Sequence, residues 1–141
     1  DSTEALGLAW KTAGGGATTT NTRIDLTGGN FTTTSTIWVD ITNLTHTLSN
    51  VSGGSFSAHS NILWFNTLAG TNSKMRFMYN VTATSVYRKT ITTGQDFDYD
   101  VCSIGTVGNT DGTVIKMQAE VSGGTVSIES QNDTMSILEV S

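Results

Sequence analysis

From Thr34 onward, apolar and polar residues alternate along most of the chain, and this period of two limits the fold more than any other feature. Residues 96–101 read Asp-Phe-Asp-Tyr-Asp-Val, and residues 115–121 alternate Ile, Met, Ala and Val with Lys, Gln and Glu. Side chains of a β-strand point alternately to its two faces, so each such run predicts one face in a core and one outside it. No stretch shows the apolar stripe of an amphipathic helix. The sequence therefore predicts an all-β protein.

Turn-forming residues separate these runs at short intervals. The turns are expected at residues 52–54, 69–72, 93–94, 105–112 and 122–124, all of which contain glycine. Residues 37–41 and 44–48 are expected as two separate short strands, and the turn at 122–124 is expected to close a β-hairpin. About eight to ten short strands at this spacing predict an antiparallel β-sandwich or jelly roll.

The first part of the chain is different in character. Residues 1–33 are rich in Gly and Thr and contain candidate strands only at 6–10 and 23–26. We predict an N-terminal segment over 1–33 that carries one or more edge strands and serves as a docking element or linker. Residues 34–141 are predicted to form the sandwich.

Charge is scarce and excludes several partners. The chain has 7 Lys and Arg against 12 Asp and Glu, a net charge of −5. A nucleic-acid surface needs clustered cations, which are scattered here, so we expect no nucleic-acid partner. No apolar run approaches the roughly 18 residues of a membrane helix, so we expect no membrane insertion.

The candidate chemistry is sparse. Asp96, Asp98 and Asp100 would project from one face of a strand, about 6–7 Å apart, and are the candidate ligands for a calcium ion. The spacing fails as an EF-hand, because Val101 and Val107 stand where that loop needs Gly and Glu. A solvated acidic face is the commoner meaning of such a run. No nucleophile, phosphate-loop or zinc motif is present, so we predict no catalytic residue, no enzyme activity and no other cofactor.

Apolar side chains occur on both faces of some strands, as in Ile-Leu-Trp-Phe at 62–65 and Phe-Met-Tyr at 77–79. A sandwich buries one face of each sheet, so the second face must meet a loop, a partner or a ligand. We predict association on this ground. The predicted interface residues are Trp38, Trp64, Phe77, Tyr79 and Tyr87.

Four segments resemble the TNF/C1q-type jelly roll, in the form found in phage and other viral fibre and decoration proteins. They are residues 38–48, 54–66, 74–80 and the closing part from 112 to 140. The resemblance implies a ten-strand TNF/C1q-like jelly roll that assembles as a homotrimer.

The expected function is that of a non-enzymatic virion surface protein, a phage capsid decoration, head fibre or tail-fibre tip. It would contact capsid or fibre proteins, with a surface glycan as a further partner, and act as a receptor-binding surface on the virion. The alternative is a monomeric carbohydrate-binding or adhesion module of an extracellular cell-surface protein. A sugar platform made by Trp10, Trp38 and Trp64 would favour the alternative.

Overall fold

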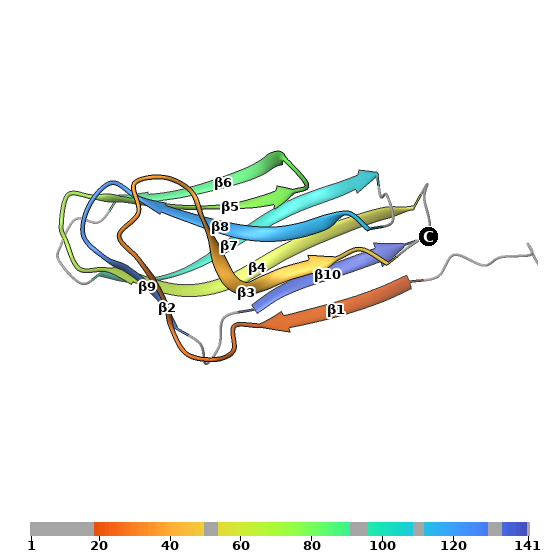
Figure 1. Cartoon of the computed structure of the whole chain (residues 1–141), viewed down its shortest axis with the longest axis horizontal. Helices are drawn as coiled ribbons and strands as arrows, with labels where there is room; N and C mark the ends of the chain where they lie inside the picture. The colour runs from red at the N-terminus through yellow and green to blue at the C-terminus, as the bar shows by residue number, and fades with distance from the viewer. Residues whose placement is uncertain (1–18, 50–53, 91–95, 109–111, 130–133, 141) are drawn as a thin grey trace, which may run out of the picture.

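The computed structural model describes residues 19–49, 54–90, 96–108, 112–129 and 134–140, with the backbone alone for 84–90 and 96–108. All regular elements in these ranges are β-strands, and they form two antiparallel sheets that pack face to face (Figure 1). No helix in this part of the chain is long and apolar enough to cross a membrane. The prediction of an all-β antiparallel sandwich is confirmed.

The two longest strands of the first sheet, sheet A, are β4 (Ser55–Asn66) and β7 (Asp96–Gly108), which pair with each other. On the other side of β4 lie β10 (Thr134–Val140) and the short β9 (Val126–Ile128). The outermost strands are β1 (Thr19–Asp25), which pairs with β10, and β2 (Phe31–Thr33), which pairs with β9. Thus β1 and β2 together follow one edge of sheet A.

The second sheet, sheet B, has the order β3-β8-β5-β6. Its strands are β3 (Val39–Thr47), β8 (Val114–Val121), β5 (Asn72–Tyr79) and β6 (Thr82–Thr90). Only β5 and β6 are joined as a hairpin within it, while the chain passes between the sheets from β3 to β4, β4 to β5, β6 to β7 and β7 to β8. This alternation between sheets is the jelly-roll arrangement.

The core lies between the sheets and is filled by the inward residues that the alternation predicts. Its largest fully buried side chains include Trp64 and Phe56 from β4 and Phe77 from β5. Leu26, which follows β1, is buried with them, and Ile24 and Phe31 pack against the same core. Residues 19–33 are therefore part of the sandwich, whereas residues 1–18 lie outside the described residues.

Two expected local structures are wrong. Residues 37–41 and 44–48 do not form two strands, because β3 runs through Val39–Thr47 with a bulge between Asp40 and Thr45. The turn at 122–124 does not close a hairpin, because β8 pairs with β3 and β5 while β9 pairs with β2 and β4 of the other sheet.

The turn at 122–124 crosses between sheets in close contact with the end of β4. Gly124 has φ +73°, and a Cβ on it would lie 2.3 Å from Asn66 Oδ1. The buried Asn66 donates from Nδ2 to Ser73 Oγ (2.9 Å) and to the Gly123 carbonyl (3.1 Å). Its Oδ1 accepts from the Leu68 backbone N–H at 3.0 Å. One amide therefore joins β4, β5 and the crossing.

Candidate functional site

Two of the residues predicted at an interface belong to the core of a single chain. Trp64 is 1% exposed and Phe77 is 0% exposed, because even-numbered positions of β4 and the inward positions of β5 point between the sheets. Met78, on the second apolar face of β5, is only 9% exposed. These side chains need no partner to leave water, so the prediction that Trp64 and Phe77 form an interface is wrong. A sugar platform that includes Trp64 is excluded because Trp64 is buried, and Trp10 lies outside the described residues.

The other predicted interface residues have different surroundings. Trp38 is half-buried, with the Arg76 guanidinium 4.2 Å from the centre of its ring. Tyr79 is half-buried against the core, with its ring centre 6.0 Å from that of Phe56. Tyr87 lies on β6, and its side chain is outside the described part of the structure.

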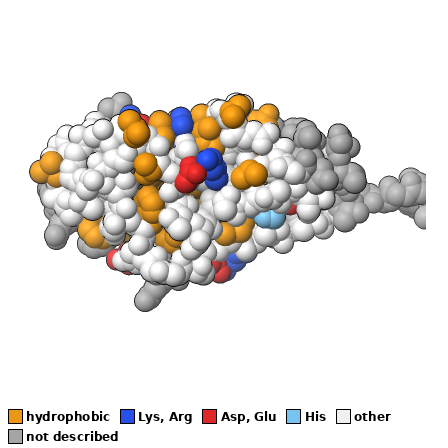
Figure 2. Space-filling view, in the orientation of Figure 1, with side chains coloured by type: hydrophobic (Ala, Val, Ile, Leu, Met, Phe, Trp, Pro, Cys, Tyr) orange, Lys and Arg blue, Asp and Glu red, His pale blue; other side chains and the backbone are white. Residues whose placement is uncertain are grey.

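The outer face of sheet B carries a network of charged and amide side chains. Asp40 accepts hydrogen bonds from Lys116 Nζ (2.8 Å) and Gln118 Nε2 (2.7 Å), and Gln118 Oε1 accepts from Arg76 Nε (2.9 Å). Burial raises the pKa of Asp40, but the hydrogen bonds from Lys116 and Gln118 and the charge of Lys116 outweigh it and hold that pKa below its usual value. In Figure 2 acidic and basic side chains meet near the middle of a mostly uncharged face. The charges on this face are therefore largely used within the chain.

The outer face of sheet A is more apolar at its centre. Asn61, Leu63 and Phe65 alternate with the buried residues of β4 and therefore point away from the core; we call them the outer strip. All three are half-buried. The neighbouring β7 pairs Tyr99 with Leu63 and Phe97 with Phe65 in register. The strip thus lies along an inner strand of the sheet, between β7 on one side and β9 and β10 on the other.

Asn61 adds a polar anomaly to this strip. Its Oδ1 is buried, yet it has no hydrogen-bond partner within the described part of the chain. Buried polar atoms in native proteins are nearly always paired, and leaving one unpaired costs roughly 1–3 kcal/mol. This oxygen is closed to solvent within one chain, so the cost is carried by the fold itself.

A buried carboxylate joins the two sheets near the C-terminal end of β10. Glu139 is 0% exposed, and its Oε2 accepts from the Ser49 backbone N–H at 3.0 Å. Its Oε1 lies 2.7 Å from His46 Nε2 of β3. His59, in contrast, is exposed on β4 and pairs in register with Ser136 and Ser103. The histidines therefore do not come together.

The predicted calcium ligands receive no test. Asp96, Asp98 and Asp100 lie on β7, where they pair in register with Asn66, Trp64 and Ile62. Their side chains, like that of Cys102, fall outside the described part. Among the side chains that the structure does describe, no group of three or more His, Cys, Asp or Glu could hold a metal ion.

Of the apolar run at 62–65, sequence reasoning selected Trp64, which faces the core, and not the two residues that face outward. The run Phe56, Ala58, Ile62 and Trp64 already defines one inward face, so its parity assigns Leu63 and Phe65 to the opposite face. That signal was available. The role of Glu139 was not predictable. The alternation of β10 puts Glu139 on the inward face, but a carboxylate there could equally mean that the alternation breaks at this residue and the side chain faces solvent.

Comparisons with known proteins show the fold but no family. No protein-family model matches the chain, and no curated protein matches it. A chain from the structure of the infectious bursal disease virus Gt strain is similar with a TM-score of 0.55 and 8% identity, covering 85% of this chain and 33% of that one. A VP2 protein of the same virus, from T=1 particles, gives a TM-score of 0.57 and 9% identity over 85% of this chain and 31% of that one. This chain therefore spans about a third of the viral chains that it matches.

An animal protein has the same fold at nearly the same length. The Eiger TNF of S. frugiperda is similar with a TM-score of 0.54 and 9% identity, covering 87% of this chain and 93% of that one. The predicted TNF-like jelly roll is thus supported by structural likeness. Identities this low show the shared fold alone.

Proposed function

We propose that this chain is a non-enzymatic structural module of a virion surface, and that it assembles as a homotrimer through the outer face of sheet A. In the virion it would serve as a capsid decoration, head fibre or tail-fibre tip. The observation that carries the assembly is the outer strip, where apolar Leu63 and Phe65 point away from the core and are only half-buried within one chain.

The physical case for a partner rests on the apolar side chains of this strip. Covering a half-buried Leu or Phe completes a burial worth roughly 1.5–3 kcal/mol for the whole side chain. Because β4 is an inner strand, its backbone groups are already paired and the contact must be made by side chains face to face.

The virion assignment is supported by the kind of protein that shares the fold. The similar VP2 protein belongs to a virus and comes from T=1 particles. Low charge is also compatible with a module whose contacts are apolar and neutral. The jelly roll needs no partner chain to fold, since its core is complete within one chain.

Light scattering after size-exclusion chromatography tests the assembly. The expected mass is about three times the 14.9 kDa of one chain. Leu63→Glu should convert the trimer to monomer, because a carboxylate would be forced into the covered face. Val81→Glu is the matched control, since Val81 is 91% exposed in the β5–β6 turn, and it should keep the trimer.

Two results would overturn the proposal. A wild-type chain that stays monomeric at high micromolar concentration would leave the alternative, a monomeric carbohydrate-binding or adhesion module. A trimer that survives Leu63→Glu would place the interface elsewhere. Immunogold electron microscopy with antibodies against the chain, on particles of the virus that encodes it, should label the particle surface; unlabelled particles would overturn the virion assignment.

A further inference from the structure

A hollow of about 330 Å³ lies at the open edge of the sandwich, between the outer strands of the two sheets. On sheet A, the ladder is interrupted after Asp25 of β1 and resumes at Phe31 of β2. On sheet B, the β3–β8 ladder shifts register between Asp40 and Thr45. Residues 26–32 and 42–43, from these two irregular stretches, line the hollow.

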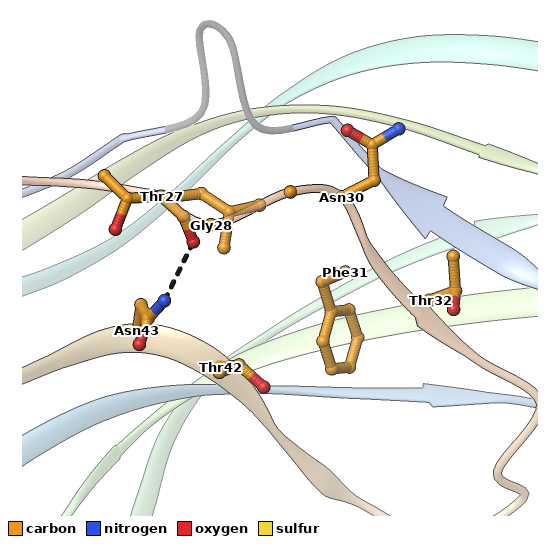
Figure 3. Close-up of a pocket in the computed structure, with 9 residues that line it drawn as sticks. Thr27, Gly28, Asn30, Phe31, Thr32, Thr42 and Asn43 are labelled. Atoms are coloured by element: carbon orange, nitrogen blue, oxygen red, sulfur yellow. Dashed lines mark hydrogen bonds between the residues drawn. The ribbon is translucent and has the colours of Figure 1, made fainter.

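A hydrogen bond between the sheets fixes the shape of this hollow. Asn43 Nδ2 donates to the Thr27 carbonyl at 2.8 Å, as the dashed line in Figure 3 shows. Asn43 has φ +68°, and Gly28 and Gly29 also have positive φ. Non-glycine residues in this region are uncommon, and such conformations concentrate at binding and switch sites. Asparagine tolerates the conformation best, so the amide is held in place at little strain.

The lining combines an apolar patch with neutral polar groups. Phe31 is half-buried and packs against the core, which fixes its ring, and the buried Leu26 also lines the hollow. In Figure 3 the Phe31 ring points from its strand toward the side of Thr42. None of the lining residues is charged. Hydroxyl and amide side chains such as Thr42 and Asn43 can both donate and accept hydrogen bonds.

We propose that this hollow binds one residue of a neutral carbohydrate, a pyranose sugar. The C–H face of such a sugar fits the apolar side formed by Phe31, and its hydroxyls, each a donor and an acceptor, match Thr42 and Asn43. The volume is at the lower end of the range of small-molecule sites, about 300–1,000 Å³. An ionised ligand would lose its hydration without gaining a charged partner.

The proposal is independent of the proposed assembly, because one chain supplies every lining residue. A monomer would bind the sugar as well as a trimer does. In a trimer, three such sites would add avidity to a weak single-site affinity.

Saturation-transfer NMR on the full chain tests the site, with the methyl pyranosides of glucose, galactose, mannose and N-acetylglucosamine as probes and glucuronic acid as the charged comparison. At least one neutral pyranoside should receive saturation at a dissociation constant of about 1 mM, strongest at the C–H protons of one ring face. Glucuronic acid should receive less.

Substitutions then locate the binding. Asn43→Gly removes the amide and permits the positive φ, and Thr42→Val removes a hydroxyl at nearly constant volume; each should weaken binding about fivefold. Asn80→Gly is the matched control, because Asn80 also has positive φ (50°) but lies in the β5–β6 turn and does not line the hollow. It should leave binding unchanged. The absence of saturation for all four neutral sugars, equal binding by Asn43→Gly, or preference for glucuronic acid would overturn the proposal.

Discussion

Glu139 Oε1 lies 2.7 Å from His46 Nε2, and this contact joins β10 of sheet A to β3 of sheet B. The carboxylate is completely buried, while the His46 side chain is 18% exposed. The second oxygen of Glu139 accepts from the Ser49 backbone N–H, just beyond the end of β3. One inward carboxylate therefore fastens the end of β3 to the opposite sheet.

Replacing Glu139 with Ala is expected to lower the free energy of unfolding by about 3 kcal/mol, because His46 and the Ser49 N–H lose their partner and a cavity remains. Glu139→Gln should cost less, about 1–2 kcal/mol, since its amide keeps one acceptor oxygen. Urea unfolding followed by circular dichroism measures both values.

The matched control for this pair is Asp25→Ala. Arg23 and Asp25 form an ion pair at the same 2.7 Å, but their side chains are 68% and 50% exposed. Solvent screening limits such a pair to about 0–1 kcal/mol. If Glu139→Ala costs no more than Asp25→Ala, the buried pair does not fasten the sheets.

The periodicity of the sequence was sufficient for the class of fold and for much of the core. Phe56, Ile62 and Trp64 share the inward face of β4 as the alternation predicts, and Met75 and Phe77 do so on β5. Period two reports which residues share a face, and this information is local. It does not report which strands pair, so the turn at Gly124 was mistaken for a hairpin although it crosses between sheets.

The candidate sites were harder to predict, because they depend on contacts between distant segments. The hollow forms only where the irregular stretch around Thr27 meets the bulge at Asn43. Bulges leave no period of their own, so the alternation before and after Asn43 looked like two strands. The unpaired oxygen of Asn61 likewise emerges only once its neighbours are known.

Gly124→Ala is expected to destabilise the chain by about 3 kcal/mol. The positive φ accounts for about 1 kcal/mol of this, and the rest comes from displacing Asn66 from its three hydrogen bonds. Gly70→Ala separates the two effects, because Gly70 has φ +77° but nothing within 4 Å of a Cβ. It should cost only about 1 kcal/mol in thermal or urea unfolding. Equal losses would mean that close approach to Asn66 is unimportant.

Asp40→Asn should reduce the sensitivity of the protein to acid. The pKa of Asp40 is lowered in the folded chain, so its stabilisation is present above the ordinary value of about 3.9 and is lost as the pH falls through the folded value. Urea unfolding from about pH 5 to about pH 2 should therefore show a smaller loss of stability in the variant. In a Lys116→Met background the same substitution should have less effect, because Lys116 is a source of the shift. If Asp40→Asn changes the acid sensitivity equally with Lys116 and with Met at position 116, Lys116 is not that source.

Arg76→Lys tests how far the Trp38 contact depends on the planar guanidinium. Lysine keeps the charge but loses the flat group that lies 4.2 Å from the ring centre and the Nε bond to Gln118. The expected loss is about 0.5–1 kcal/mol, and a double-mutant cycle with Trp38→Leu should show that the two residues are coupled. Additive losses would mean that the stacking contributes nothing. Light scattering on Trp38→Leu adds a second outcome: because the proposed assembly uses sheet A, the mass should stay unchanged, and a monomer would instead place Trp38, which precedes β3 of sheet B, at the interface.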